Sequence, residues 1–247
     1  QPLPFADLQK RIGRKTTPAK LLRDTPVILY AYDLLEWEGE DIRNRPFLER
    51  RALLDTTLRD VPSDAPIKLS PQIKANTWED FAQTRAEARA HHAEGLMLKR
   101  TDSLYLAGRK KGDWWKWKLD PLTIDAVMIY AQAGHGRRAN LFTDFTFAVR
   151  DGNTLVPFAK AYSGLTDDEF REITAWVRKH TVQRFGPVRQ VPGDLVFELA
   201  FEGVQSSPRH KSGVALRFPR ILRWRRDKTA DQADSLAHLH ALLAQYG

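Results

Sequence analysis

The sequence contains no cysteine among its 247 residues. This absence excludes disulfide frameworks, thiolate catalysis and cysteine-ligated zinc, and it is typical of a reducing compartment, so we expect a cytoplasmic protein. No apolar run approaches the roughly 20 residues that cross a bilayer. The residues after Gln1 also lack the apolar core of a signal peptide. We therefore expect no membrane partner.

Three familiar catalytic signatures are missing as well. There is no G-x-x-x-x-G-K-[ST] loop, so any ATP would be held without a P-loop. There is no G-x-S-x-G segment, which leaves hydrolase triads without support. His238 and His240 fall on different faces of a helix and form no convincing metal pair.

The composition is that of a folded globular protein, with 42% hydrophobic, 10% aromatic and 28% charged residues. Lysine and arginine number 39 against 31 acidic residues, which gives a net charge of +8. A surplus of this size favours a polyanionic partner if the charges cluster.

Residues 1–120 mix helices and strands. The patterns predict strands at 27–35, 95–98 and 114–119, and helices at 46–54 and 77–91. The continuous apolar run at 27–35 favours a buried strand, in which Asp33 is conspicuous. Thr77 and Asp80 resemble a capping box. Residues 1–26 show little periodicity and are expected to be connecting structure.

Residues 121–247 have the spacing of an all-β domain. The predicted strands are 123–132, 141–150, 154–162, 194–202 and 214–224. A helix begins at the capping box Thr166–Glu169, and an amphipathic helix starts at Asp231. The fold class is therefore α+β, with a five-stranded barrel in the second half and a boundary near Asp120 and Pro121.

Basic residues cluster between Arg209 and Lys228. This stretch of sequence contains eight of them and a single acidic residue, Asp227. Such a density requires phosphates or carboxylates nearby, and the alternative is a solvated strand face. Lys116 and Lys118 alternate along a strand and so share one face. Glu94 and Lys99 lie at opposite ends of a short apolar strand, which by itself is ordinary.

In order along the chain, these segments resemble the later motifs of ATP-dependent DNA ligases, in the nucleotidyltransferase superfamily. Tyr30-Ala31-Tyr32-Asp33-Leu34-Leu35, Glu94-Gly95-Leu96-Met97-Leu98-Lys99 and Lys116-Trp117-Lys118 are similar to motifs of the adenylation domain. Leu216-Arg217-Phe218-Pro219-Arg220 and Arg225-Arg226-Asp227-Lys228 are similar to motifs of the OB domain. The first of these OB segments and an early L-Q-K-R-I-G-R-K run favour DNA ligases over capping enzymes.

The resemblance implies a partial antiparallel-sheet adenylation domain at 1–120 and an OB-fold domain at 121–247. It implies ATP and Mg²⁺ as cofactors, with nicked double-stranded DNA as the partner of a monomer. Tyr32 would stack on adenine beside Met97, Glu94 would help hold Mg²⁺, and Lys116 and Lys118 would contact the α-phosphate. Arg225 and Lys228 would orient pyrophosphate. DNA contacts are expected from Arg137, Arg138, Arg217 and Arg220.

One motif of the family is absent. The nucleophile is the lysine of K-x-D-G, but the only Asp-Gly pair here is Asp151-Gly152, with Val149 in the lysine position, and a hairpin turn explains it better. Together with the start at Gln1, this predicts a C-terminal part of a ligase that cannot adenylate itself and whose N-terminal part is its partner. The alternatives are a non-catalytic DNA-binding module and an RNA ligase or capping-type enzyme.

Overall fold

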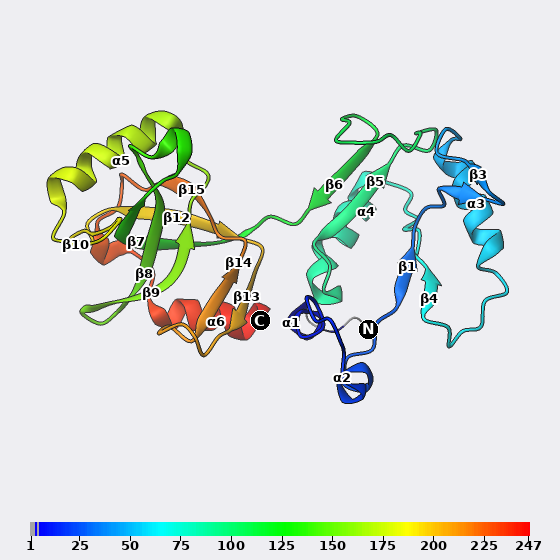
Figure 1. The fold of residues 1–247 in the computed structure, drawn as a ribbon, viewed down its shortest axis with the longest axis horizontal. Coiled ribbons are helices and arrows are strands. Elements are labelled where there is room, and N and C mark those ends of the chain that lie inside the picture. Colours follow the sequence, from blue (N-terminus) through cyan, green and yellow to red (C-terminus); the bar gives the residue numbers. More distant parts are fainter. Residues whose placement is uncertain (1–2, 4) are drawn as a thin grey trace. The chain divides into compact units, whose positions relative to one another are not determined.

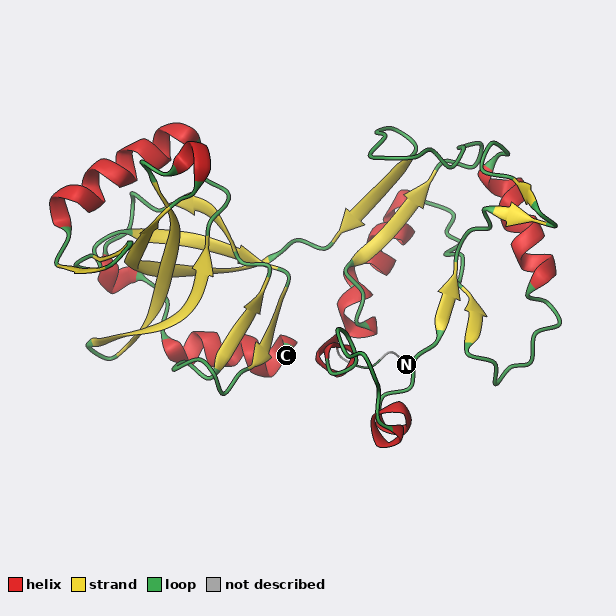
Figure 2. Ribbon diagram, viewed as in Figure 1, coloured by secondary structure: helices red, strands yellow, loops and turns green. Residues whose placement is uncertain are grey.

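The computed structural model describes residue 3 and residues 5–247. They belong to two compact units, Gln1–Leu119 (unit 1) and Asp120–Gly247 (unit 2), whose elements are drawn in Figures 1 and 2. The sequence predicts a boundary near Asp120 and Pro121, and the division of the structure falls between Leu119 and Asp120. In the described part of the chain, no helix is both long enough and apolar enough to cross a bilayer.

The described strands of unit 1 form separate pairs instead of one continuous sheet. β1 (Leu29–Ala31) pairs in parallel with β4 (Ile67–Leu69), and β2 (Glu36–Trp37) pairs with β3 (Glu40–Asp41). β5 (Gly95–Lys99) and β6 (Trp114–Lys118) form an antiparallel hairpin. The helical segments are α1 (Phe5–Gln9), α2 (Ala19–Asp24), α3 (Phe47–Thr57), α4 (Trp78–Ala86) and the 3₁₀ turn η1 (Ala88–His91).

The helix boundaries of unit 1 follow local chemistry. α3 begins directly after Pro46, whose fixed φ suits the start of a helix, as predicted. The capping box of α4 is confirmed, because the Thr77 side chain accepts the Asp80 N–H and the Asp80 side chain accepts the Thr77 N–H. The prediction that residues 1–26 only connect was wrong, since α1 and α2 lie there. Their short length left too little periodicity to detect.

The predicted burial of the 27–35 strand was wrong. Only residues 29–31 are β-structure, and Leu29 is 61% exposed and Tyr30 47%. The reason is that β1 has β4 as its single neighbour among the described strands. The clustered core lies in unit 2, whereas the buried hydrophobic residues described in unit 1 are Ile42, Phe47, Leu54 and Ala88.

Unit 2 contains a curled antiparallel sheet of seven strands, where five were predicted, and a separate two-stranded pair. The long strands β7 (Leu122–Ala133), β8 (Phe142–Asp151) and β9 (Thr154–Ala161) follow one another, and β12 (Val196–Phe201) joins β7 to β15 (Arg220–Trp224). The other elements are η2 (Gly136–Arg138), α5 (Asp167–His180), β10 (Gln183–Phe185), β11 (Val188–Gln190), β13 (Gly203–Ser206), β14 (Val214–Arg217), η3 (Ala230–Gln232) and α6 (Leu236–Tyr246).

The curl brings the end of β9 close to β15. The Ile221 N–H donates to the Ser163 carbonyl at 2.9 Å. At Gly164 the φ is +108°, and a Cβ would lie 1.7 Å from the Ile221 carbonyl oxygen, so only glycine permits this approach. The sheet encloses a core with many phenylalanines, including the fully buried Phe145, Phe147, Phe158, Phe170, Phe197 and Phe201.

The predicted elements of unit 2 are present, with three differences. The hairpin β10–β11 and the strand β13 were not predicted, because these strands are only three or four residues long. The expected strand 214–224 is broken at Phe218, whose φ is +52°. The last helix begins at Leu236 behind the Ser235 cap, since Asp231 belongs to η3. The turn at Gly152 is confirmed by the Asp151–Thr154 pairing.

Candidate functional site

The β5–β6 hairpin collects the predicted nucleotide-binding residues on one face. Gly95 pairs with Lys118, Met97 with Lys116, and Lys99 with Trp114. Directly opposed residues of an antiparallel pair share a face, and so do alternate residues of a strand. Met97 and Lys116 are both exposed, and Lys116 has no ion pair among the described residues.

Glu94 lies at one end of this face. Its Oε2 is 3.0 Å from the Lys118 Nζ, and both side chains are about two-fifths exposed, at 42% and 40%. Gly95 has φ +137°, and a Cβ there would lie 2.2 Å from the Trp117 carbonyl oxygen. A glycine at this position therefore lets the two strands approach beside the Glu94–Lys118 pair.

The β5–β6 face offers a metal ion one carboxylate, that of Glu94. In the part of the chain that the structure describes, no cluster of three metal-ligating side chains exists. Mg²⁺ is commonly bound through one or two carboxylates together with substrate phosphates. Glu94 therefore fits as one ligand of such an ion, provided that phosphate oxygens complete the shell.

The other end of the face is an aromatic cage around Lys99, a residue that the sequence analysis treated as ordinary. The Lys99 Nζ lies 4.2 Å from the ring centres of Tyr32 and Trp114 and 4.8 Å from that of Phe47. Burial lowers the pKa of Lys99 to about 8, with Asp33 opposing and Arg51 and Arg50 adding to the effect. The rings supply an electron-rich lining for the ammonium group. This contact places Tyr32, which is 48% exposed, beside the hairpin face.

The conspicuous Asp33 is explained by a buried ion pair. Its carboxylate accepts two hydrogen bonds from Arg50, from Nε and Nη2, each at 2.9 Å. The two side chains are 3% and 0% exposed. Arg50 also donates to the carbonyls of Arg45 and Ser103. The pair fixes the chain next to Tyr32 against α3.

In unit 2, Arg225 and Lys228 converge on one carboxylate that the sequence analysis missed. The Arg225 Nη1 is 2.9 Å and the Lys228 Nζ 2.5 Å from Asp125 Oδ2. Arg225 also binds Asp227 at 2.8 Å. The hydrogen bond to Asp227 raises the pKa of Arg225, and the same bond lowers the pKa of Asp227 to about 2. The two predicted cations are therefore brought together.

Carboxylates from distant elements neutralise most of the basic run 209–228. Arg220 pairs with Glu202, Arg223 with Glu198, and Arg226 with Glu172. With Arg225 and Lys228, at least five of the eight basic residues have an acidic partner among the described residues. The imbalance of one acid among eight bases therefore exists along the sequence but not in the fold. The balancing acids are Asp125 on β7, Glu198 on β12, Glu202 directly after β12 and Glu172 on α5.

The expected DNA-contacting arginines lie in or beside two connections of unit 2. Arg137 and Arg138 belong to η2 between β7 and β8, and Arg138 pairs with Asp167 at 3.0 Å. Arg217 and Arg220 flank the turn between β14 and β15. At that turn Phe218 is 65% exposed in a left-handed conformation, and the Arg217 guanidinium lies 5.2 Å from its ring centre. Strained residues of this kind cluster at functional sites. The left-handed conformation of Phe218 could not be predicted, because a residue before proline ordinarily favours an extended backbone.

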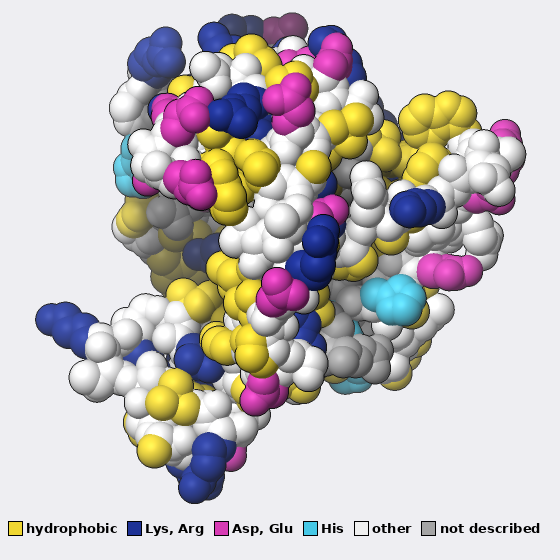
Figure 3. All heavy atoms as spheres, turned by 90° about the vertical axis from the view of Figure 1, so that its right-hand side faces the viewer, with side chains coloured by type: hydrophobic (Ala, Val, Ile, Leu, Met, Phe, Trp, Pro, Cys, Tyr) yellow, Lys and Arg dark blue, Asp and Glu magenta, His cyan; other side chains and the backbone are white. Residues whose placement is uncertain are grey.

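Some of the basic residues have no acidic partner. Arg109, Lys110 and Lys111 are exposed in the loop between β5 and β6, and within the described residues none of them forms an ion pair. By contrast, Figure 3 shows basic and acidic side chains intermixed on the face that it draws, with hydrophobic groups between them. The 109–111 loop is therefore a local excess of positive charge.

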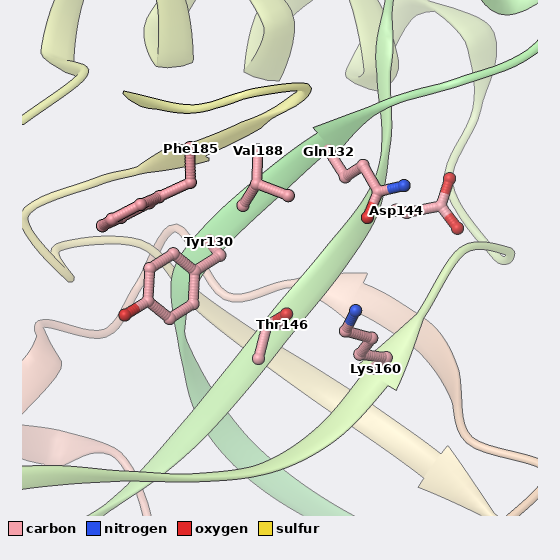
Figure 4. Close-up of a pocket in the computed structure, with 7 residues that line it drawn as sticks. All are labelled: Tyr130, Gln132, Asp144, Thr146, Lys160, Phe185 and Val188. Carbon is pink, nitrogen blue, oxygen red and sulfur yellow. The ribbon is translucent and has the colours of Figure 1, made fainter. Parts of the chain in front are cut away.

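Unit 2 also carries a pocket of about 460 Å³ on the outer side of β7, β8 and β9. Figure 4 shows Tyr130 and Phe185 at one end, with the Gln132 and Asp144 side chains at the other. The two rings are 6.4 Å apart. The remaining lining residues are Thr146, Lys160 and Val188. The pocket thus joins an aromatic wall to polar groups and one cation.

Comparison with known families identifies both units. Residues 1–118 match the model described as ATP dependent DNA ligase domain, and residues 138–228 match ATP dependent DNA ligase C terminal region. A probable DNA ligase of Koribacter versatilis is 40% identical over 96% of the chain, and one of Opitutus terrae is 39% identical over 99%. The chain spans 44% and 27% of their lengths, respectively.

A solved structure described as "Pmar-Lig_PreS3" has the same fold, with a TM-score of 0.67 over 91% of this chain and 49% of its own, at 19% identity. The predicted α+β class is thereby confirmed, and the barrel expected in the second half is present as a curled antiparallel sheet. The ordered motifs, the fold and both family matches agree, so the chain belongs to the ATP-dependent DNA ligase family.

Proposed function

We propose that this chain is the C-terminal part of an enzyme that seals nicks in double-stranded DNA with ATP. The observation that carries the proposal is the hairpin face, which aligns Met97, Lys116 and Lys118 between the Glu94 carboxylate and the ring of Tyr32. A nucleotide laid along this face would meet an aromatic ring at its base and ammonium groups at its phosphate.

The reaction of the family has three phosphoryl transfers: attack of a lysine on ATP, transfer of AMP to the 5′-phosphate, and attack of the 3′-hydroxyl. Each step depends on positioning and on neutralising phosphate charge. Lys116, which is exposed and without an ion pair among the described residues, would contact the α-phosphate. Lys118 would also contact the phosphate, and its ion pair with Glu94 would then break. Tyr32 would hold adenine by stacking.

Glu94, once released from Lys118, would supply one oxygen to Mg²⁺. When bound, the ion neutralises phosphate charge and lowers the pKa of the attacking group. In unit 2, Arg225 and Lys228 would orient pyrophosphate as the leaving group.

DNA binding is supported by features of both units. OB-type sheets bind oligonucleotides on the face of their central strands and in the adjoining loops. The Tyr130–Lys160 pocket and the η2 loop with Arg137 and Arg138 occupy such positions. Apolar side chains can wedge into a minor groove, a role for Phe218 between Arg217 and Arg220. The 109–111 loop would add phosphate contacts.

The chain lacks K-x-D-G, so we propose that a segment carrying this motif completes unit 1. The exposed apolar residues of β1 and the few buried hydrophobic residues of unit 1 support an additional layer of structure there. The completed enzyme would act as a monomer in the cytoplasm.

The test uses labelled ATP, magnesium and nicked duplex DNA, with and without the N-terminal segment of the same ligase. We expect no covalent label on the chain alone, and label followed by nick sealing once the segment is added. Lys116→Met should abolish sealing, while Lys74→Met, in an exposed loop of the same unit, should not. Covalent label on the chain alone would overturn the proposal that the chain lacks the nucleophile.

The same assay separates the alternatives. Binding of nicked DNA without sealing by the completed protein would favour a non-catalytic module, which the absence of K-x-D-G also supports for the chain by itself. Sealing of nicked RNA alone, or label from GTP instead of ATP, would favour an RNA ligase or a capping-type enzyme.

A further inference from the structure

We infer that Asp125 is a positioning residue, which holds Arg225 and Lys228 together as a pair able to grip a diphosphate. The inference rests on the proposed function for the identity of the ligand, pyrophosphate. Its structural basis lies wholly within unit 2. Nothing in the local sequence points to Asp125, which is 100 and 103 residues away from the two cations.

Asp125 is fixed before any ligand arrives. Its side chain is only 9% exposed. Its backbone N–H donates to Asp234 Oδ2 at 2.8 Å, and its carbonyl accepts the Asp234 N–H at 2.9 Å. Its neighbours on β7, Ile124 and Ala126, are buried in the core. The carboxylate therefore has little freedom to move.

The two cations share this carboxylate but differ in what else holds them. Arg225 donates from Nη1 to both Asp125 oxygens, at 3.2 and 2.9 Å. Lys228 reaches Oδ2 from the other side of a short turn, in which its N–H donates to the Arg225 carbonyl at 3.2 Å. Two positive charges bound to one carboxylate are held close together, and they leave a net positive charge once Asp227 is displaced from Arg225, which suits the two phosphates of one ligand.

The remaining donors of Arg225 indicate where a ligand would bind. Nε and Nη2 contact Asp227, whose side chain is 64% exposed. An exposed ion pair contributes little and is readily exchanged, whereas breaking the buried contact with Asp125 would strand a carboxylate. A phosphate oxygen would therefore replace Asp227 on Arg225, while Asp125 keeps both cations in place.

The opposite role is also chemically possible and gives a different result. If Asp125 merely competed with phosphate for the cations, its removal would free them, and anions would bind more tightly. If it positions them, its removal lets the two side chains separate, and a diphosphate binds more weakly. The direction of the change in affinity decides between the two.

The experiment titrates the chain with inorganic pyrophosphate and follows the arginine Nε–H signals by NMR. We expect a saturable shift of the Arg225 signal in the wild type. Asp125→Asn should weaken pyrophosphate binding about tenfold, as expected for a lost charge-assisted contact. Glu172→Gln is the matched control, because it removes the exposed carboxylate partner of the neighbouring Arg226 and should leave the affinity unchanged.

Asp125→Glu keeps the charge but displaces it by one methylene, so it should also weaken binding. This variant covers the case in which Asp125→Asn does not fold, as judged by thermal melting. Unchanged or tighter binding in the folded variants, or no pyrophosphate binding to the wild type, would overturn the inference. The proposed function can fail separately. If pyrophosphate binding depends on Asp125 but the protein with its N-terminal segment seals no nick, only the proposed function would be overturned.

Discussion

Asp33 and Arg50 show how a single buried pair shapes unit 1. Both side chains are almost completely inaccessible, and the guanidinium forms a bidentate contact and two further bonds to backbone carbonyls. Such a pair adds little to stability compared with an apolar substitute, but removing one partner leaves a buried charge. The aspartate that looks out of place in an apolar run is therefore a structural necessity.

Asp33→Ala should lower the free energy of unfolding by about 3–5 kcal/mol, because Arg50 loses its buried counter-charge. Urea denaturation followed by tryptophan fluorescence measures the change. Asp41→Ala is the control, since its pair with Arg43 is exposed, and it should cost far less than Asp33→Ala. Equal effects of the two substitutions would contradict the prediction.

Lys99 should make stability depend on pH. Its pKa of about 8 in the fold lies below the ordinary 10.5, so the folded chain releases this proton first. The contribution of Lys99 to the free energy of unfolding is therefore constant below pH 8 and rises as the pH increases from about 8 to about 10.5.

Lys99→Met should remove the contribution of Lys99 to this rise in the free energy of unfolding. The contributions of the other lysines and the tyrosines remain. Urea unfolding of the wild type and the variant at pH 7, 9 and 10 provides the comparison. Parallel pH profiles for the two proteins would show that the caged ammonium group does not titrate in this range.

At the scale of elements, the β5–β6 hairpin is the part on which the proposed chemistry depends. Its register, and not the spacing along the chain, places Met97 opposite Lys116 and Glu94 beside Lys118. The close approach at Gly95 is possible only without a side chain.

Gly95→Ala should therefore destabilise the chain by at least about 1–3 kcal/mol, the usual cost of a strained backbone conformation, and should separate Glu94 from Lys118. Differential scanning calorimetry measures the loss. Gly203→Ala is the control, because the nearest atom to an added Cβ is 3.9 Å away and no strain is present. An unchanged melting temperature for Gly95→Ala would contradict the assigned register.

At the scale of the whole molecule, the net charge of +8 is distributed unevenly. The densest basic run of the sequence is largely neutralised by carboxylates in the fold. The three basic residues at 109–111 keep their full charge, since no described carboxylate pairs with them. Affinity for a polyanion depends on uncompensated charge.

Lys110→Gln with Lys111→Gln should reduce the salt dependence of nicked-duplex binding by about two released counterions, because each phosphate contact contributes a slope of roughly 0.9. Arg223→Gln with Arg226→Gln removes the same formal charge from paired residues and should change the slope much less. Fluorescence anisotropy at 50 to 200 mM salt, a range of the order used for such slopes, distinguishes them. Equal changes would mean that the ion pairs open on binding.

The sequence alone determined the family, the fold class, most strands of unit 2 and the helices α3, α4 and α5, because these follow from periodicity, caps and ordered motifs. It could not determine that the 27–35 run is exposed, since burial depends on neighbouring layers.

Only the tertiary structure decided which charges are paired. Asp125 meets Arg225 and Lys228 from 100 and 103 positions away, and Glu198 and Glu172 neutralise arginines whose own neighbours in the sequence are basic. Coulomb energy depends on distance in space and on burial, whereas a sequence records only distance along the chain. The aromatic contacts of Lys99 also depend on the tertiary structure, because the three rings around its ammonium group come from three separate segments of the chain.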